Sequence, residues 1–176
     1  MLRGIIKIAN AVNESIGRAV AWLTTLLVVL VCFDVARRGL FNTTAAWIME
    51  LEWHLFALVF LLGAGYTLKY DRHVRVDLFY AKFSKKDQAW VNLLGTLLLL
   101  IPWCLLLIYA SYFYALSAYQ IGECSPDPGG LPARYLIKSA ITVGISLLLL
   151  QAFALAASSI LILQNKTPEE SVSENL

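Results

Sequence analysis

Four long apolar stretches restrict what this chain can fold into. They cover residues 17–40, 46–69, 89–119 and 136–163, and a helix needs on the order of 20 residues to cross a hydrocarbon core of about 30 Å. Lipid forces the backbone to satisfy its hydrogen bonds internally, and these stretches lack the alternation of barrel strands. Only 15% of the 176 residues are charged, against roughly 25% in soluble domains. The sequence therefore predicts an all-α integral membrane protein with four transmembrane helices.

The segments outside the four stretches are short, so residues 1–163 are predicted to form a single membrane domain. Residues 164–176 are polar and net acidic and predict a disordered tail. Before the first span, apolar residues recur at helical spacing and polar residues gather on the opposite face. This pattern predicts an amphipathic helix over residues 2–16 on the membrane surface, with a frayed terminal extension as the alternative. Arg3, Lys7 and Arg18 on its polar face are candidates for contact with lipid headgroups.

The distribution of lysine and arginine predicts the orientation of the helices. The N-terminal segment, the connection between the second and third spans and the tail share one side of the membrane and carry ten of these residues; the opposite side carries four. The positive-inside rule then places both termini in the cytoplasm.

The candidate chemistry of the chain is sparse. His54 and His73 are nineteen positions apart on one predicted helix and its exit, so about 28 Å separates them along the axis and they cannot bind one haem. The three cysteines are isolated. Nucleophile motifs and phosphate-binding loops do not occur. We therefore predict no enzyme activity, catalytic residue, cofactor, metal ion or nucleic-acid partner.

Two acidic residues, Glu50 and Glu52, lie near the start of the second span. Glu50 is about 5 Å along the helix from Trp47, so it is close to the interface and far from the midplane. Ionisable residues inside a span are candidates for function. We favour a structural ion pair with Arg37 or Arg38 across the short connection; contact with another subunit and transport chemistry are the alternatives.

Proline and glycine mark two further features. Pro102 lies inside the third span and predicts a kink, because proline removes a backbone donor. Residues 121–132 are dense in proline and glycine and predict an ordered or semi-ordered outer loop. Small residues at four-residue spacing allow helices to approach closely. Such pairs are Gly17 with Ala21, Ala140 with Gly144, and Ala154 with Ser158.

A more specific pattern lies between Arg37 and Asp77. It consists of Arg38, Phe41-Asn42, Trp47, Glu50, Leu62-Gly63-Ala64-Gly65-Tyr66 and His73-Val74-Arg75-Val76-Asp77. This stretch resembles the DctQ-type small membrane subunit, or Q subunit, of tripartite ATP-independent periplasmic (TRAP) transporters. The length and the four spans fit the family too. Leu51-Glu52 follows Glu50 where many members have adjacent acids, which leaves open which acid fills the family role.

The resemblance implies a partnership in the bacterial inner membrane. A large permease, the M subunit, would carry an organic anion with sodium ions, and a periplasmic solute-binding protein, the P subunit, would deliver the anion. The small subunit would be non-catalytic and brace the immobile scaffold of an elevator-type permease among phospholipids. Candidate residues for the subunit interface or a structural motif are Arg38, Trp47, Glu50, Trp53, Gly63, Gly65, His73, Arg75 and Asp77.

Three further residues have candidate roles. Arg75 is a candidate for lipid headgroup contact, and Glu123 and Asp127 in the outer loop are candidates for contact with the binding protein. Two other classes of function stay open at this point. One is a membrane anchor for a redox or signalling enzyme, and the other is a small self-assembling transporter in which Glu50 or Glu52 would be indispensable.

Overall fold

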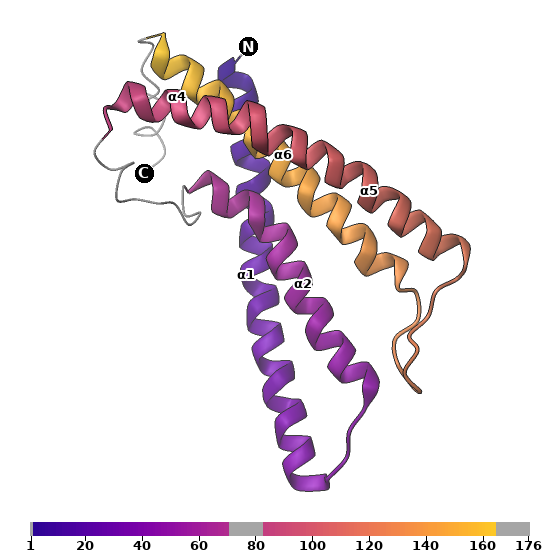
Figure 1. Ribbon diagram of the computed structural model, residues 1–176. Helices are drawn as coiled ribbons and strands as arrows, with labels where there is room; N and C mark the ends of the chain where they lie inside the picture. Colours follow the sequence, from indigo (N-terminus) through magenta and orange to yellow (C-terminus); the bar gives the residue numbers. More distant parts are fainter. Residues whose placement is uncertain (1, 71–82, 165–176) are drawn as a thin grey trace.

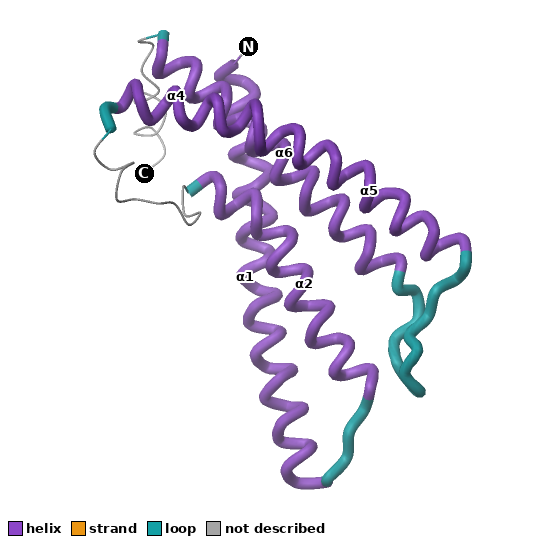
Figure 2. The backbone as a smooth tube through the Cα atoms, viewed as in Figure 1, coloured by secondary structure: helices purple, strands orange, loops and turns teal. Residues whose placement is uncertain are grey.

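The computed structural model describes residues 2–70 and 83–164. The candidates His73, Arg75 and Asp77 and the predicted tail from residue 165 onward lie outside the described residues. Within the described ranges the regular structure is helical (Figure 2). The elements are α1 (Leu2–Phe41), α2 (Ala46–Lys69), α4 (Lys85–Gly95), the π-helical turn η1 (Thr96–Leu100), α5 (Ile101–Gln120) and α6 (Tyr135–Leu163).

The prediction of an all-α fold with four membrane-spanning helices is confirmed. Among the described residues, four helices are long and apolar enough to cross a membrane, the third formed by α4, η1 and α5 together. The helices α1 and α2 form one hairpin, and α5 and α6 form another. Figure 1 shows the hairpins meeting near the ends that hold Leu2 and Leu163 and diverging toward the opposite end. Helix α6 is central, because it packs against α1, α2, α4 and α5.

Small residues explain why α6 can contact so many helices. Its buried positions are mostly alanine, glycine and serine, and the side chains there leave room for neighbouring backbones. At Gly144 a Cβ atom would lie 2.6 Å from the carbonyl oxygen of Leu61 in α2. Of the predicted small-residue pairs, Ala140 and Gly144 are both buried in this contact region. Gly17 is buried against the Tyr66 ring, whereas its partner Ala21 is exposed.

The predicted boundary between a helix over residues 2–16 and the first span is wrong: α1 is one continuous helix from Leu2 to Phe41. The buried residues Ala9, Asn13, Gly17 and Val20 form a stripe that runs across the expected boundary, so a turn there would break the packing of α1 against α2 and α6. At 1.5 Å per residue the 40-residue helix is about 60 Å long, roughly twice the thickness of a hydrocarbon core.

The distortion expected at Pro102 takes the form of a wide helical turn. The turn η1 directly precedes it, and the backbone N–H of Ile101 bonds to the carbonyl of Thr96, five residues earlier. A proline ring clashes with the carbonyl four residues before it in an α-helix and offers no N–H. An extra residue in the preceding turn shifts the carbonyls, so the third span continues through Pro102 without ending.

Candidate functional site

Three acidic side chains in the membrane-spanning helices make the main polar contacts of the fold. They are Glu14 and Asp34 in α1 and Glu50 in α2, and each one is paired with at least one basic side chain. A charged group in a span needs such compensation, because its burial in a medium of low dielectric is costly. Their partners therefore show what each acid does in the fold.

The carboxylate of Glu50 connects α2 to the segment between α5 and α6. Its side chain is only 5% exposed. Its Oε1 accepts hydrogen bonds from the hydroxyl of Ser125 and, at 3.3 Å, from the guanidinium of Arg134, while its Oε2 accepts from the backbone N–H of Leu131. We call these contacts of Glu50 with Ser125, Leu131 and Arg134 the Glu50 latch. Both carboxylate oxygens are occupied by groups of the same loop.

The prediction that Arg37 or Arg38 neutralises Glu50 is wrong. Both arginines instead pair with Asp34, three and four residues before them on the same helix face. Asp34 is completely buried, so it needs this compensation more than an exposed acid would. The spacing of Asp34 with the two arginines was the signal in the sequence that could have identified the pair.

Residues 121–134, the α5–α6 loop, are ordered as the proline and glycine pattern predicted. The N–H of Ser125 donates to the carbonyl of Leu131 at 3.2 Å, and the N–H of Arg134 donates to the carbonyl of Glu123 at 3.0 Å. The inner of these bonds, between Ser125 and Leu131, encloses a tight turn. In this turn Gly129 has a φ of 76°, in the left-handed region that glycine adopts without strain. The loop thus consists of two stretches, one leaving α5 and one leading to α6, that are hydrogen-bonded to each other.

Gly130 makes room for the latch from the loop side. A Cβ atom there would lie 2.8 Å from Oε2 of Glu50 and 2.4 Å from the hydroxyl oxygen of Ser125. Such distances are too short for non-bonded atoms, so any larger residue would push the carboxylate and the hydroxyl apart. The glycine is therefore part of the site, although the sequence pattern indicated only a turn.

The two acids predicted to contact a binding protein have different environments. Glu123 pairs with Lys138 in the first turn of α6, and the lysine side chain is mostly buried. Asp127 is exposed, and its backbone N–H bonds to the hydroxyl of Ser125. Glu123 is thus occupied within the chain, and Asp127 is the one of the two that the loop presents to solvent.

Two tryptophans flank Glu50 on α2. The ring of Trp53 stacks on His54 with 3.9 Å between centroids and lies 5.8 Å from the guanidinium of Arg134. His54 bonds through Nδ1 to the backbone carbonyl of Glu50. Trp47 and Trp53 both remain about half exposed. The start of α2 therefore combines a buried carboxylate with an exposed aromatic surface.

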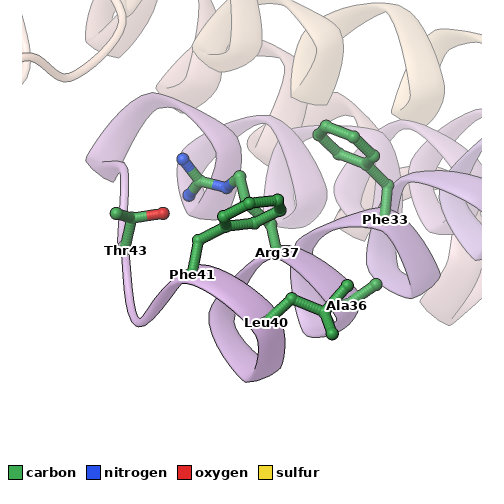
Figure 3. Close-up of a pocket in the computed structure, with 6 residues that line it drawn as sticks. All are labelled: Phe33, Ala36, Arg37, Leu40, Phe41 and Thr43. Atoms are coloured by element: carbon green, nitrogen blue, oxygen red, sulfur yellow. The ribbon is translucent and has the colours of Figure 1, made fainter.

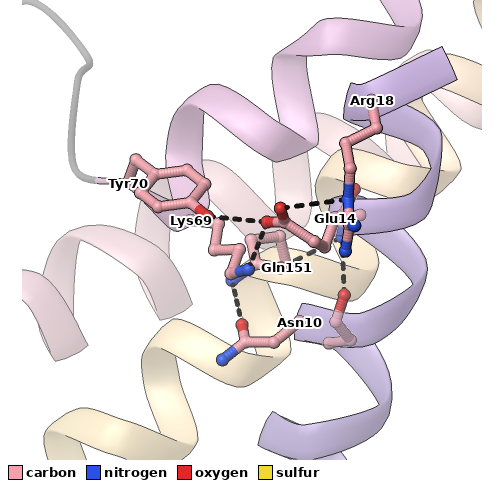
Figure 4. Close-up of polar contacts among 8 residues, drawn as sticks. Asn10, Glu14, Arg18, Lys69, Tyr70 and Gln151 are labelled. Carbon is pink, nitrogen blue, oxygen red and sulfur yellow. Dashed lines mark hydrogen bonds and ion pairs between the residues drawn. The ribbon is translucent and has the colours of Figure 1, made fainter. Parts of the chain in front are cut away.

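Glu14 forms the corresponding polar contact near the other end of α2 (Figure 4). Its carboxylate lies 2.6 Å from Nζ of Lys69 and accepts from the hydroxyl of Tyr70 at 2.7 Å. Arg18 also lies 3.4 Å from it and is largely exposed. The hydrogen bond to Glu14 raises the pKa of Tyr70 above its usual value, so the phenol stays a protonated donor. This carboxylate fixes the end of α2 to α1.

A second polar cluster joins α1 to α6. The side chain of Gln151 donates to Asn10 at 2.9 Å and accepts from Asn13 at 3.0 Å, as Figure 4 shows in part. Asn10 and Glu14 lie on the same helix face as the candidate headgroup residues, but their side chains bond to neighbouring helices. Arg3 and Lys7 of the same face are exposed. Asn13 and Gln151 were not among the residues predicted from the sequence.

The two candidate glycines of α2 differ in how closely they are packed. Gly65 is buried, and a Cβ atom there would lie 2.1 Å from Oδ1 of Asn13. At Gly63 the nearest atom to such a Cβ is a methyl carbon of Val20 at 3.8 Å, an ordinary contact. Gly65 therefore serves close packing within this chain, and Gly63 leaves room for a side chain.

A shallow apolar pocket of about 520 Å³ lies at the end of α1 (Figure 3). Its walls are mainly hydrocarbon, and the one charged group among them is Arg37, which is already paired with Asp34. The lining residues are Phe33, Ala36, Arg37, Leu40, Phe41 and Thr43. A pocket of this composition suits an acyl chain or an apolar side chain.

Within the described residues, four helices that can cross a membrane define a multi-pass membrane protein, in which Glu14, Asp34 and Glu50 each pair with a basic side chain of the same chain. The family model of the DctQ component of tripartite ATP-independent periplasmic transporters matches residues 27–161. The chain therefore belongs to the DctQ family and is a small membrane subunit of a TRAP transporter. The resemblance seen between Arg37 and Asp77 is thereby confirmed. No individual curated protein matches the chain.

Proposed function

We propose that this subunit braces the immobile scaffold of a large elevator-type permease during Na⁺-coupled uptake of an organic anion. A periplasmic solute-binding protein would deliver the anion. The observation that carries the proposal is the way three acids of the spans are used: Glu14, Asp34 and Glu50 each bond to a basic group of the same chain. A residue that binds and releases ions during transport needs access to the ion, whereas these carboxylates are committed to holding helices and a loop together.

The exposed surfaces of α1 and α5 are largely apolar, which supports the proposal of a membrane-embedded partner. Beyond Val20 most of α1 is exposed, and α5 carries exposed aromatic residues along its length. Lipid and a larger membrane subunit can both cover such surfaces. Trp47, Trp53 and Arg38 are partly exposed at the ends of α1 and α2 where the hairpins diverge, so they are the described interface candidates that a permease could reach. His73, Arg75 and Asp77 stay predictions from the sequence.

Omitting this subunit tests the bracing role directly. Liposomes that contain the permease, with the binding protein added outside, are expected to lose at least nine-tenths of sodium-driven uptake when the small subunit is left out. Adding the purified subunit back should restore uptake, because it returns the brace to a permease that already holds the transport site. Sodium-driven uptake by the small subunit alone would contradict the proposal, and so would full uptake by the permease without it.

We propose further that both termini lie in the cytoplasm of a bacterium and that the α5–α6 loop faces the periplasm. The charge distribution supports this orientation, and it would place exposed Arg3, Lys7 and Arg18 near the headgroups of the inner leaflet. Alkaline phosphatase needs the periplasm to fold. Its fusion after residue 176 is expected to be inactive and its insertion after Pro126 active; the reverse pattern would contradict this orientation.

A further inference from the structure

The α5–α6 loop depends on a different helical hairpin for much of its support. A connection of this length is commonly mobile when only its ends are fixed. Here three groups of different kinds, the hydroxyl of Ser125, the N–H of Leu131 and the guanidinium of Arg134, converge on the carboxylate of Glu50 in α2. Hydrogen bonds to an ionised acceptor are stronger than neutral ones, so Glu50 is the main external support of the loop.

Removing the Glu50 carboxylate would leave all three groups without their acceptor. An unpartnered backbone N–H and an uncompensated guanidinium favour conformations in which water solvates them. The internal bond between Ser125 and Leu131 would weaken at the same time, because both residues also contact Glu50. The loop would then sample many conformations where it now has one.

The ordered loop presents a short, stiff, acidic turn. Asp127 is exposed between Pro126 and Pro128, and each proline restricts the backbone. The N–H of Asp127 bonds to the hydroxyl of Ser125, which itself donates to Glu50. One residue therefore separates Asp127 from Ser125 of the latch, and the Glu50 carboxylate fixes the position of the exposed turn through Ser125.

We propose that Glu50 is a positioning residue for docking of the solute-binding protein. Its carboxylate holds the α5–α6 loop in one conformation, so the exposed Asp127 turn is already in place when a basic face of the binding protein arrives. A preformed surface avoids the entropy loss of ordering a loop during binding, and the exposed acid provides charge complementarity. The inference rests on the proposed function, because it requires a binding protein that contacts this subunit.

The test compares two acids that are two residues apart on the same helix. Glu50→Ala and Glu50→Gln remove the latch, and Glu52→Gln is the matched control because Glu52 makes none of the loop contacts. Gly130→Ala attacks the latch from the loop without changing a charge in the span. Asp127→Lys alters the presented turn and leaves the latch intact. Each variant is made in the full complex with its permease, in nanodiscs.

Two measurements are made on each variant. Hydrogen exchange of the backbone amides in residues 123–134 reports the order of the loop, and the Kd of the purified solute-binding protein reports docking. Glu50→Ala and Gly130→Ala should speed exchange at least tenfold and raise the Kd about tenfold, with Glu50→Gln in between. Asp127→Lys should raise the Kd with little change in exchange. Glu52→Gln should stay within twofold of the unaltered complex in both.

Each contrary result has a distinct meaning. Faster exchange with an unchanged Kd would overturn the positioning role, and unchanged exchange in Glu50→Ala would overturn the role of the latch in ordering the loop. Sodium-driven uptake is measured in addition for Glu50→Gln, and normal binding with abolished uptake would assign Glu50 to transport, which also overturns the inference. If the unaltered complex does not bind the solute-binding protein at all, the proposed function fails instead.

Discussion

Replacing Gly144 with alanine is expected to lower the free energy of unfolding of the purified subunit by about 1–3 kcal/mol, the usual effect of overpacking. The added methyl group would lie 2.6 Å from the carbonyl oxygen and 2.8 Å from the carbonyl carbon of Leu61. These are backbone atoms of α2, so they cannot turn aside as a side chain would. Leucine at the same position should prevent the two hairpins from packing. Thermal unfolding in detergent, followed by tryptophan fluorescence, measures both variants.

Gly95→Ala is the matched control for this substitution. Gly95 is also helical, and an added Cβ would meet nothing within 4 Å. Alanine has a higher helix propensity than glycine by about 1 kcal/mol, so this variant should be as stable as the unaltered subunit or more stable. If Gly144→Ala and Gly95→Ala unfold at the same temperature, α2 and α6 do not approach as closely as described.

Replacing Glu14 with lysine is expected to destabilise the subunit by about 1–2 kcal/mol, because hydrogen bonds to charged groups contribute amounts of that order. The change removes the acceptor of Lys69 and Tyr70 and places two cations together where α1 meets the end of α2. Both members of the original pair are mostly shielded from water, so solvent and salt screen them less than an exposed pair. The melting temperature and the yield from membranes should both fall.

Exchanging the charges of Glu14 and Lys69 shows how much of the lost stability is due to their ion pair. The double variant Glu14→Lys with Lys69→Glu should recover at least half of the lost stability, because it restores the attraction in reverse. Arg18→Ala removes a largely exposed cation from the same carboxylate and should change stability by less than about 0.5 kcal/mol. A double variant no more stable than Glu14→Lys alone would show that the pair contributes little.

The spans could be predicted from the sequence because hydropathy is a local property of about 20 residues. The boundary at residue 16 could not, because the continuity of α1 depends on which helices cover Asn13 and Gly17. Asn13 bonds to Gln151, far along the chain in α6. A periodic pattern shows that a segment has a polar face, but it does not show whether water, lipid or another helix lies against that face.

The role of Glu50 was predicted in kind but not in detail. A structural ion pair was the favoured reading, and the structure confirms an ion pair, but the partner is Arg134. That residue is 84 positions away along the chain, and the α5–α6 loop brings it to α2 across the gap between the two hairpins. The predicted partners, Arg37 and Arg38, are the arginines nearest to Glu50 along the chain, and they already have a local partner in Asp34. The missed pair could have been found from helical spacing alone.

The divergence of the two hairpins, with the Glu50 latch across the open end, has a mechanical consequence (Figure 1). Two stiff legs joined at one end behave as a hinge, whereas a tie between their free ends turns them into a triangle. A triangle keeps its angles under a sideways load without needing rigid corners. If the proposed bracing role holds, this arrangement would let the subunit resist shear from a moving permease through a few contacts at three points, although its helices bury little surface against one another.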